Sequence, residues 1–194
     1  MKRIIVLLVL FSATLFAGDM KTLMAGDQAP AFALKNYDGK EYKLDKLIKD
    51  NKFTVLMWIS TQCPVSNSYN ERMVKLYDMY TSKGIAFVGI NSNKAETVSD
   101  IEKHSKDKNF KFAVLKDDQN KIADLYGAMH TPEIFVVNKK GAIVYHGRID
   151  DSKDPAGIEK HDLSDALDAL LAGKKVENTE TKAFGCSIKR IQAD

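Results

Sequence analysis

The feature that most constrains this chain is a continuous apolar run, 53–59, that ends shortly before Cys63 and Pro64. A short run with several β-branched and aromatic residues favours a buried central strand over a helix. Proline fits the first turn of a helix, and apolar residues follow at helical spacing until Gly84. The pattern predicts a strand, a turn and a helix, with Cys63 at the start of the helix.

Strands and helices alternate through the rest of the chain. We expect an N-terminal hairpin around the turn Asp38-Gly39, because Asp-Gly between two extended pieces favours a tight turn. The other predicted elements are a strand at 85–90, a helix at 96–106, a strand at 112–115, a short helix at 122–126, a hairpin of 134–137 with 142–145, and an amphipathic helix at 163–171. This order predicts an α/β domain of three layers, a mixed sheet flanked by helices with an N-terminal hairpin extension.

The two ends of the chain differ from this domain. Residues 1–17 have the layout of a secretory signal peptide, with Lys2 and Arg3 before an apolar stretch and small residues after it. We therefore expect a secreted protein, in a bacterium a periplasmic one, which touches a membrane only if this segment stays uncleaved. Residues 18–173 form the predicted domain, and 174–194 form a polar tail that carries Cys186.

Composition excludes some functions. Apolar residues make up 44% of the chain and charged residues 28%, as in soluble globular proteins. The formal net charge is +3, and two of the positive charges lie in the signal peptide. No basic stripe with interleaved aromatic residues is present, so nucleic acid is not an expected partner. His104, His146 and His161 are scattered and match no metal-ligand spacing. The Asp150-Asp151 pair could suggest a metal, but we expect it to form a solvated turn, and we expect no metal and no cofactor.

Cys63 has the chemistry of a reactive thiol. The N–H groups and partial positive charge at a helix start stabilise a thiolate, which is the nucleophilic form of cysteine. The only other cysteine of the chain is Cys186. In an oxidising compartment the pair could be joined. A purely structural disulfide across so long a loop would stabilise the fold by about 4.7 kcal/mol, so this reading stays open beside a redox role.

Three motifs occur in a recognisable order: GDQAPAF at 26–32, CPVS at 63–66 and TPEIFVV at 131–137. Together they resemble the redoxin branch of the thioredoxin superfamily, which contains the AhpC/TSA-like peroxiredoxins and the periplasmic thioredoxin-like oxidoreductases. The resemblance covers residues 23–171 and implies a thioredoxin-like fold.

The resemblance also implies roles for particular residues. Cys63 takes the position of the nucleophilic cysteine, and Pro132 that of a cis-proline, whose loop with Thr131 aligns the substrate. Ser66 stands where thioredoxins have their second cysteine, so the usual Cys-x-x-Cys pair is absent. Cys186 is then the only internal candidate for a resolving thiol.

The match to peroxiredoxins is incomplete. Ser60 occupies the position where they have threonine or serine, but Leu56 replaces their upstream proline. Their thiolate-stabilising arginine has no counterpart in the cis-proline loop, where His130 stands, and Arg72 and Arg148 are alternative candidates. Supporting residues near Cys63 are Trp58, as core or site wall, and Thr61 and Gln62, which could hydrogen-bond the sulfur or cap the helix.

We therefore expect a thiol-dependent oxidoreductase that uses one of two reactions. Cys63 could attack a peroxide and form a sulfenic acid, or attack a protein disulfide and form a mixed disulfide. Both reactions need a reducing thiol partner. The alternative is a redoxin-fold copper-binding or chaperone-like protein without catalysis, in which soft thiolates would suit cuprous ion or Cys63 and Cys186 form only a structural disulfide.

Overall fold

The computed structural model describes residues 21–191. The predicted signal peptide, 1–17, lies outside these residues. Within the described part of the chain, no helix combines the length and the apolar character that crossing a membrane requires.

The centre of the fold is a mixed sheet of seven strands in the order β2-β1-β5-β4-β3-β7-β8. Strand β3 runs parallel to β4 and antiparallel to β7, and β1 pairs antiparallel with β5. The predicted hairpin therefore extends one edge of the sheet. The strands are β1 (Ala33–Asn36), β2 (Glu41–Lys43), β3 (Phe53–Trp58), β4 (Ile85–Asn91), β5 (Ala113–Lys116), β7 (Glu133–Asn138) and β8 (Ile143–Gly147).

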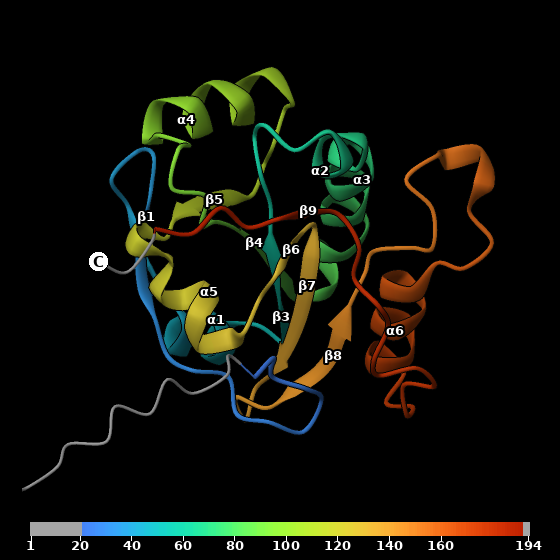
Figure 1. The fold of residues 1–194 in the computed structure, drawn as a ribbon. Helices are drawn as coiled ribbons and strands as arrows, with labels where there is room; N and C mark the ends of the chain where they lie inside the picture. The colour runs from blue at the N-terminus through green and yellow to red at the C-terminus, as the bar shows by residue number, and fades with distance from the viewer. Residues whose placement is uncertain (1–20, 192–194) are drawn as a thin grey trace, which may run out of the picture.

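Helices cover both faces of this sheet (Figure 1). They are α1 (Leu44–Asp50), α2 (Pro64–Ser68), α3 (Asn70–Tyr80), α4 (Val98–Asp107), α5 (Lys121–Tyr126) and α6 (Asp162–Leu171), with 3₁₀ turns at Thr81–Lys83, Asp118–Asn120 and Pro155–Gly157. Helices α3, α4 and α6 pack on one face, and α1 and α5 pack on the other. The predicted three-layer α/β fold is confirmed.

Strand β3 contributes to both cores, which explains its uninterrupted apolar sequence. Val55 and Met57 face the core with α3 and α6, whereas Leu56 and Trp58 face the core with α5. A strand covered by helices on both faces has no solvent side, so alternation of apolar and polar residues is lost.

The helices differ from the sequence prediction in three places. The helix after Cys63 is divided at Tyr69 into α2 and α3. Helix α4 begins later than predicted, because Thr97 and Asp100 form a capping box that leaves Glu96 outside the helix. Helix α1 was not predicted, and its weak signal is understandable because Leu44 is its only fully buried residue.

The C-terminal tail lies against the domain and crosses the front of the molecule in Figure 1. His146 exchanges two backbone hydrogen bonds with tail residues Thr179 and Thr181. Further along, strand β9 (Cys186–Ser187) pairs antiparallel with β6 (His130–Thr131). These contacts are made mainly by backbone groups, so a polar sequence without periodicity forms them readily.

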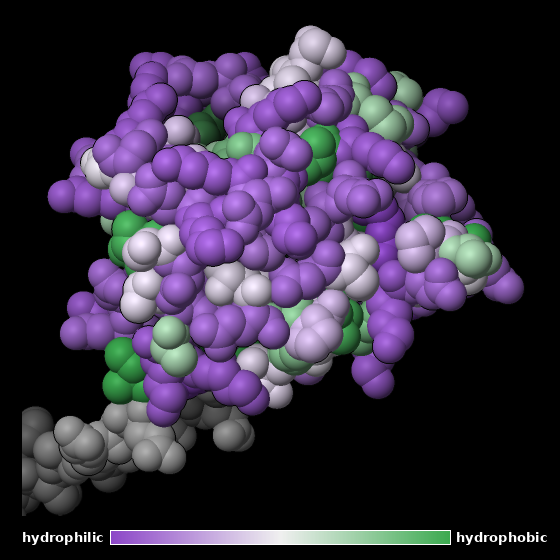
Figure 2. Space-filling model, turned by 90° about the horizontal axis from the view of Figure 1, so that it is seen from above, coloured by the Kyte–Doolittle hydropathy of each residue, from purple (hydrophilic) through white to green (hydrophobic). Residues whose placement is uncertain are grey.

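The face of the molecule shown in Figure 2 is mostly hydrophilic, with apolar side chains scattered over it. The large exposed apolar residues among those described come from separate elements: Met24, Met79, Val98, Leu125, Met129 and Ile191. On the face shown in Figure 2, the apolar side chains form no large continuous patch of the kind that marks a protein interface.

His146 fastens the tail through its side chain as well as its backbone. Its Nε2 lies 2.8 Å from a carboxylate oxygen of Glu133 in β7, and its Nδ1 lies 2.8 Å from one of Glu180 in the tail. Burial alone would lower the pKa of His146. The hydrogen bonds and charges of the two carboxylates outweigh burial, and the net effect is a raised pKa.

The raised pKa of His146 predicts a pH-dependent stability. The unfolded chain has an imidazole pKa of about 6.5, so the stabilisation is complete below that pH and is lost as pH rises through the higher folded value. Each unit of elevation corresponds to about 1.4 kcal/mol. Urea unfolding across neutral and mildly alkaline pH should show this loss in the wild type and in the control His161→Gln. A His146→Gln variant that keeps the same pH dependence would refute the assignment.

Candidate functional site

Cys63 lies between the end of β3 and the start of α2, and it is the N-cap residue of that helix. The backbone N–H of Ser66 donates to Cys63 Sγ at 3.3 Å. Cys63 is only 4% exposed. The predicted strand, turn and helix therefore place the sulfur where a backbone N–H would stabilise the negative charge of a thiolate in the reduced protein.

The loop before β7 faces this sulfur. The Thr131–Pro132 peptide bond is cis, and the carbonyl oxygen of Thr131 lies 3.4 Å from Cys63 Sγ. Both loop residues are buried. The structure thus brings together the two motifs that the sequence separates by almost seventy positions.

Cys186 completes the site from the tail. It forms a disulfide with Cys63, with the two Cα atoms 5.9 Å apart. In the pairing of β6 with β9, Cys186 stands opposite Thr131. A strand pair thus holds the tail cysteine beside the cis-proline loop and within bonding distance of Cys63.

Glu96 is a site residue that the sequence analysis did not identify. It is 3% exposed, and its carboxylate accepts hydrogen bonds from the Ser60 hydroxyl, the Thr61 N–H and hydroxyl, and the Asn91 amide, at 2.5 to 2.9 Å. Ser60 Oγ in turn accepts the N–H of Cys63 at 2.9 Å. Glu96 therefore holds the turn that carries the cysteine. A polar residue just before a helix cap was the only signal for it.

The other supporting residues have defined positions. Ser66 accepts the N–H of Ser60 through its hydroxyl, at 3.1 Å. Thr61 contacts Glu96, and Cys63 itself caps the helix. Thr61 therefore neither hydrogen-bonds the sulfur nor caps the helix. Trp58 is fully buried against Tyr126, with ring centroids 5.0 Å apart, which makes it a core residue.

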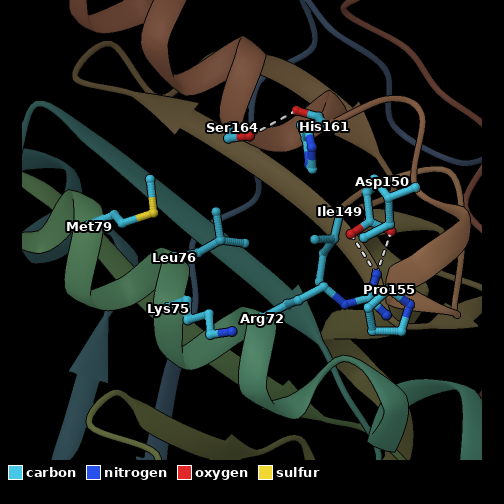
Figure 3. Close-up of a pocket in the computed structure, with 10 residues that line it drawn as sticks. Arg72, Lys75, Leu76, Met79, Ile149, Asp150, Pro155, His161 and Ser164 are labelled. Atoms are coloured by element: carbon cyan, nitrogen blue, oxygen red, sulfur yellow. Dashed lines mark hydrogen bonds and ion pairs between the residues drawn. The ribbon is translucent and has the colours of Figure 1, made fainter.

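Neither candidate arginine serves Cys63 in this arrangement. Both oxygens of Asp150 accept from one guanidinium nitrogen of Arg72, at 2.6 and 2.7 Å, and Arg148 donates to Asp162 at 2.7 Å. Arg72 and Asp150 line a cavity of about 450 Å³ between α3 and α6, and Figure 3 shows this pair among the lining side chains. Asp150 is 2% exposed, so the expectation of a solvated turn is wrong at this residue.

Among residues 21–191, no three or more His, Cys, Asp or Glu side chains are placed so that they could hold a metal ion. His146 does contact two carboxylates, but each of them hydrogen-bonds a different nitrogen of the imidazole ring.

Residues 25–146 match the model of the AhpC/TSA family. Thiol-disulfide oxidoreductase ResA of Bacillus cereus is 28% identical over 148 residues, which cover 73% of this chain and 83% of ResA. Peroxiredoxin Q of Oryza sativa is 25% identical over 127 residues, 62% of this chain and 57% of that protein.

Among solved structures, an uncharacterized conserved protein from Geobacillus kaustophilus is 34% identical, with a TM-score of 0.82 over 88% of this chain and 94% of its own. Its likeness extends well beyond the segment matched by the family model. The family match, the shared fold and the joined cysteines lead to one conclusion: this chain belongs to the AhpC/TSA family and is a thiol-dependent oxidoreductase of the peroxiredoxin-like and thioredoxin-like class.

Proposed function

We propose that this protein exchanges disulfides with protein substrates, with Cys63 as the nucleophile and Cys186 as the resolving thiol. One observation carries the proposal: the two sulfurs meet beside the cis-Thr131–Pro132 loop. Strand pairing holds the tail, and with it Cys186, at this position. This arrangement supplies the second thiol that Ser66, in the usual position, does not.

The reaction has two steps. The Cys63 thiolate attacks one sulfur of a substrate disulfide, the substrate bond breaks, and the other substrate sulfur leaves as a thiolate. The Cys186 thiolate then attacks Cys63 Sγ and releases the second substrate thiolate. The substrate gains two electrons, and the protein ends with the Cys63–Cys186 disulfide. Since Cys63 is 4% exposed beneath the docked tail, the tail moves aside in the reduced protein to admit the substrate.

Two observations favour a disulfide substrate over a peroxide. The arginines within residues 21–191, Arg72, Arg148 and Arg190, are engaged by Asp150, Asp162 and Asp124, so none of them takes the place of the arginine that peroxiredoxins have at their thiolate. The relative with the greater coverage is named a thiol-disulfide oxidoreductase. Residues 1–17 and the disulfide itself support action in an oxidising compartment outside the cytoplasm.

Single cysteine variants test the two roles. Cys63→Ser should lower insulin reduction with dithiothreitol to the uncatalysed rate, because no nucleophile remains. Cys186→Ser should form mixed disulfides with insulin that persist, because the resolving step is lost. Both are measured by turbidity and by non-reducing gels with mass spectrometry. Adducts that form equally well in Cys63→Ser would contradict the assignment of the nucleophile.

The proposed function also predicts the result of a peroxidase assay. Hydrogen peroxide should oxidise the reduced protein at most about thirtyfold faster than free cysteine at pH 7, which is the gain of a full thiolate over a few per cent thiolate. No larger gain is expected, because the described arginines are paired elsewhere and do not polarise the peroxide. The measurement is the stopped-flow change in tryptophan fluorescence, with thiol titration as the check. Oxidation about a thousandfold faster than free cysteine would establish a peroxidase instead, since thiolate character alone accounts for far less.

Glu96 is proposed as a positioning residue for the Cys63 turn. Glu96→Gln puts an amide donor among groups that donate, so unfolding should require about 2 kcal/mol less free energy. The pH dependence of the alkylation rate of reduced Cys63 should also change, because the turn no longer fixes the position of the cysteine. Glu102→Gln, an exposed position on α4, is the control for both measurements. A stability loss with an unchanged alkylation profile would leave Glu96 a purely structural residue.

A further inference from the structure

The two sulfurs of the disulfide differ in their surroundings. Cys63 is buried, and its Sγ is enclosed by the Ser66 N–H at 3.3 Å and the Thr131 carbonyl at 3.4 Å. Cys186 is partly exposed, and the tail residue that follows it, Ser187, is exposed. A molecule that approaches the closed protein therefore reaches Cys186 before it reaches Cys63.

The stability of the leaving thiolate also favours Cys186 as the sulfur that is attacked. In thiol–disulfide exchange the incoming thiolate attacks one sulfur, and the other departs with the electron pair, faster when its thiolate is more stable. One N–H of α2, that of Ser66, donates to the Cys63 sulfur. Cys186 lies in a two-residue strand and, unlike Cys63, caps no helix. Cys63 is therefore the better leaving sulfur as well as the less accessible one.

We propose that the reducing partner opens this disulfide by attacking Cys186, so that the protein receives electrons at the tail sulfur and delivers them to substrate from Cys63. The inference rests on the proposed function for its biological setting, but the site of attack is a property of the closed fold. Substrate and reductant then meet different sulfurs because they meet different states of the tail, which is open for the substrate and docked for the reductant.

The reduction balances with a dithiol as the partner. Its first thiolate bonds to Cys186 Sγ, the Cys63–Cys186 bond breaks, and Cys63 leaves as a thiolate. Its second thiolate attacks the partner's own sulfur in the mixed disulfide and releases Cys186 as a thiolate. The partner ends as a disulfide that has lost two electrons, and the protein ends with two free cysteines.

Charge near Cys186 indicates the kind of dithiol that fits. In the sequence, exposed Lys182 lies four positions before Cys186 and exposed Lys189 three positions after it, and the backbone N–H of exposed Lys94 donates to the carbonyl of Lys189 at 2.9 Å. Arg190 is neutralised by Asp124. These lysines favour the approach of an anionic thiolate on an acidic surface.

Adduct mapping tests the inference directly. The oxidised protein is mixed briefly with glutathione, quenched with acid, alkylated with N-ethylmaleimide and digested for mass spectrometry. We expect glutathione on Cys186 and maleimide on Cys63, with a preference of about tenfold or more from access and leaving-group stability together. Equal labelling, or glutathione mainly on Cys63, would overturn the inference. So would failure of both sulfurs to react in the time that the denatured protein reacts.

Two controls separate this result from the proposed function. In denaturant the oxidised chain should carry glutathione on both cysteines in comparable amounts, because the fold no longer distinguishes them. Insulin reduction is measured on the same preparation. An inactive protein that is still labelled on Cys186 would retain the inference and lose the proposed function, whereas an active protein labelled on Cys63 would do the reverse.

Discussion

The site depends on the antiparallel pairing of β6 with β9, because that pairing connects its two halves. Strand β6 leads into the cis-Thr131–Pro132 loop, and β9 carries Cys186. The Ile188 N–H adds a backbone hydrogen bond to the Met129 carbonyl just beyond the pair, and the Ile188 side chain joins the core beneath α5. Backbone pairing fixes the register of the tail, and register decides which tail residue meets Cys63.

Placing the second thiol on a docked tail changes the problem that the fold must solve. In a Cys-x-x-Cys helix the two thiols are neighbours in sequence and need no docking. Here the sequence separation is 123 residues, so the effective concentration of Cys186 at Cys63 depends on how firmly the tail is held. In the proposed reaction, contacts such as that of Glu180 with His146 therefore influence how readily the disulfide forms, although they lie outside the sulfur pair.

Sequence patterns predicted the parts of the site that are local. Cys63 could be placed because an apolar strand and a proline-started helix flank it, and Pro132 because it precedes a strand. The position of Cys186 could not be derived, since tail docking depends on backbone hydrogen bonds that leave no periodic trace. Glu96 and Glu133 were missed for a related reason: their hydrogen-bond partners are set by tertiary structure and not by spacing.

These two buried carboxylates have the same task on opposite sides of the disulfide. Glu96 accepts the Thr61 N–H in the turn before Cys63, and Glu133 accepts the N–H groups of Met129 and His130 in the turn before Pro132. Neither turn belongs to a helix or a main-sheet strand, so the carboxylates supply acceptors that regular secondary structure does not give these N–H groups. A carboxylate accepts several such donors at once and fixes the loop in one conformation. The geometry around the sulfurs is thus held by charged side chains that never touch them.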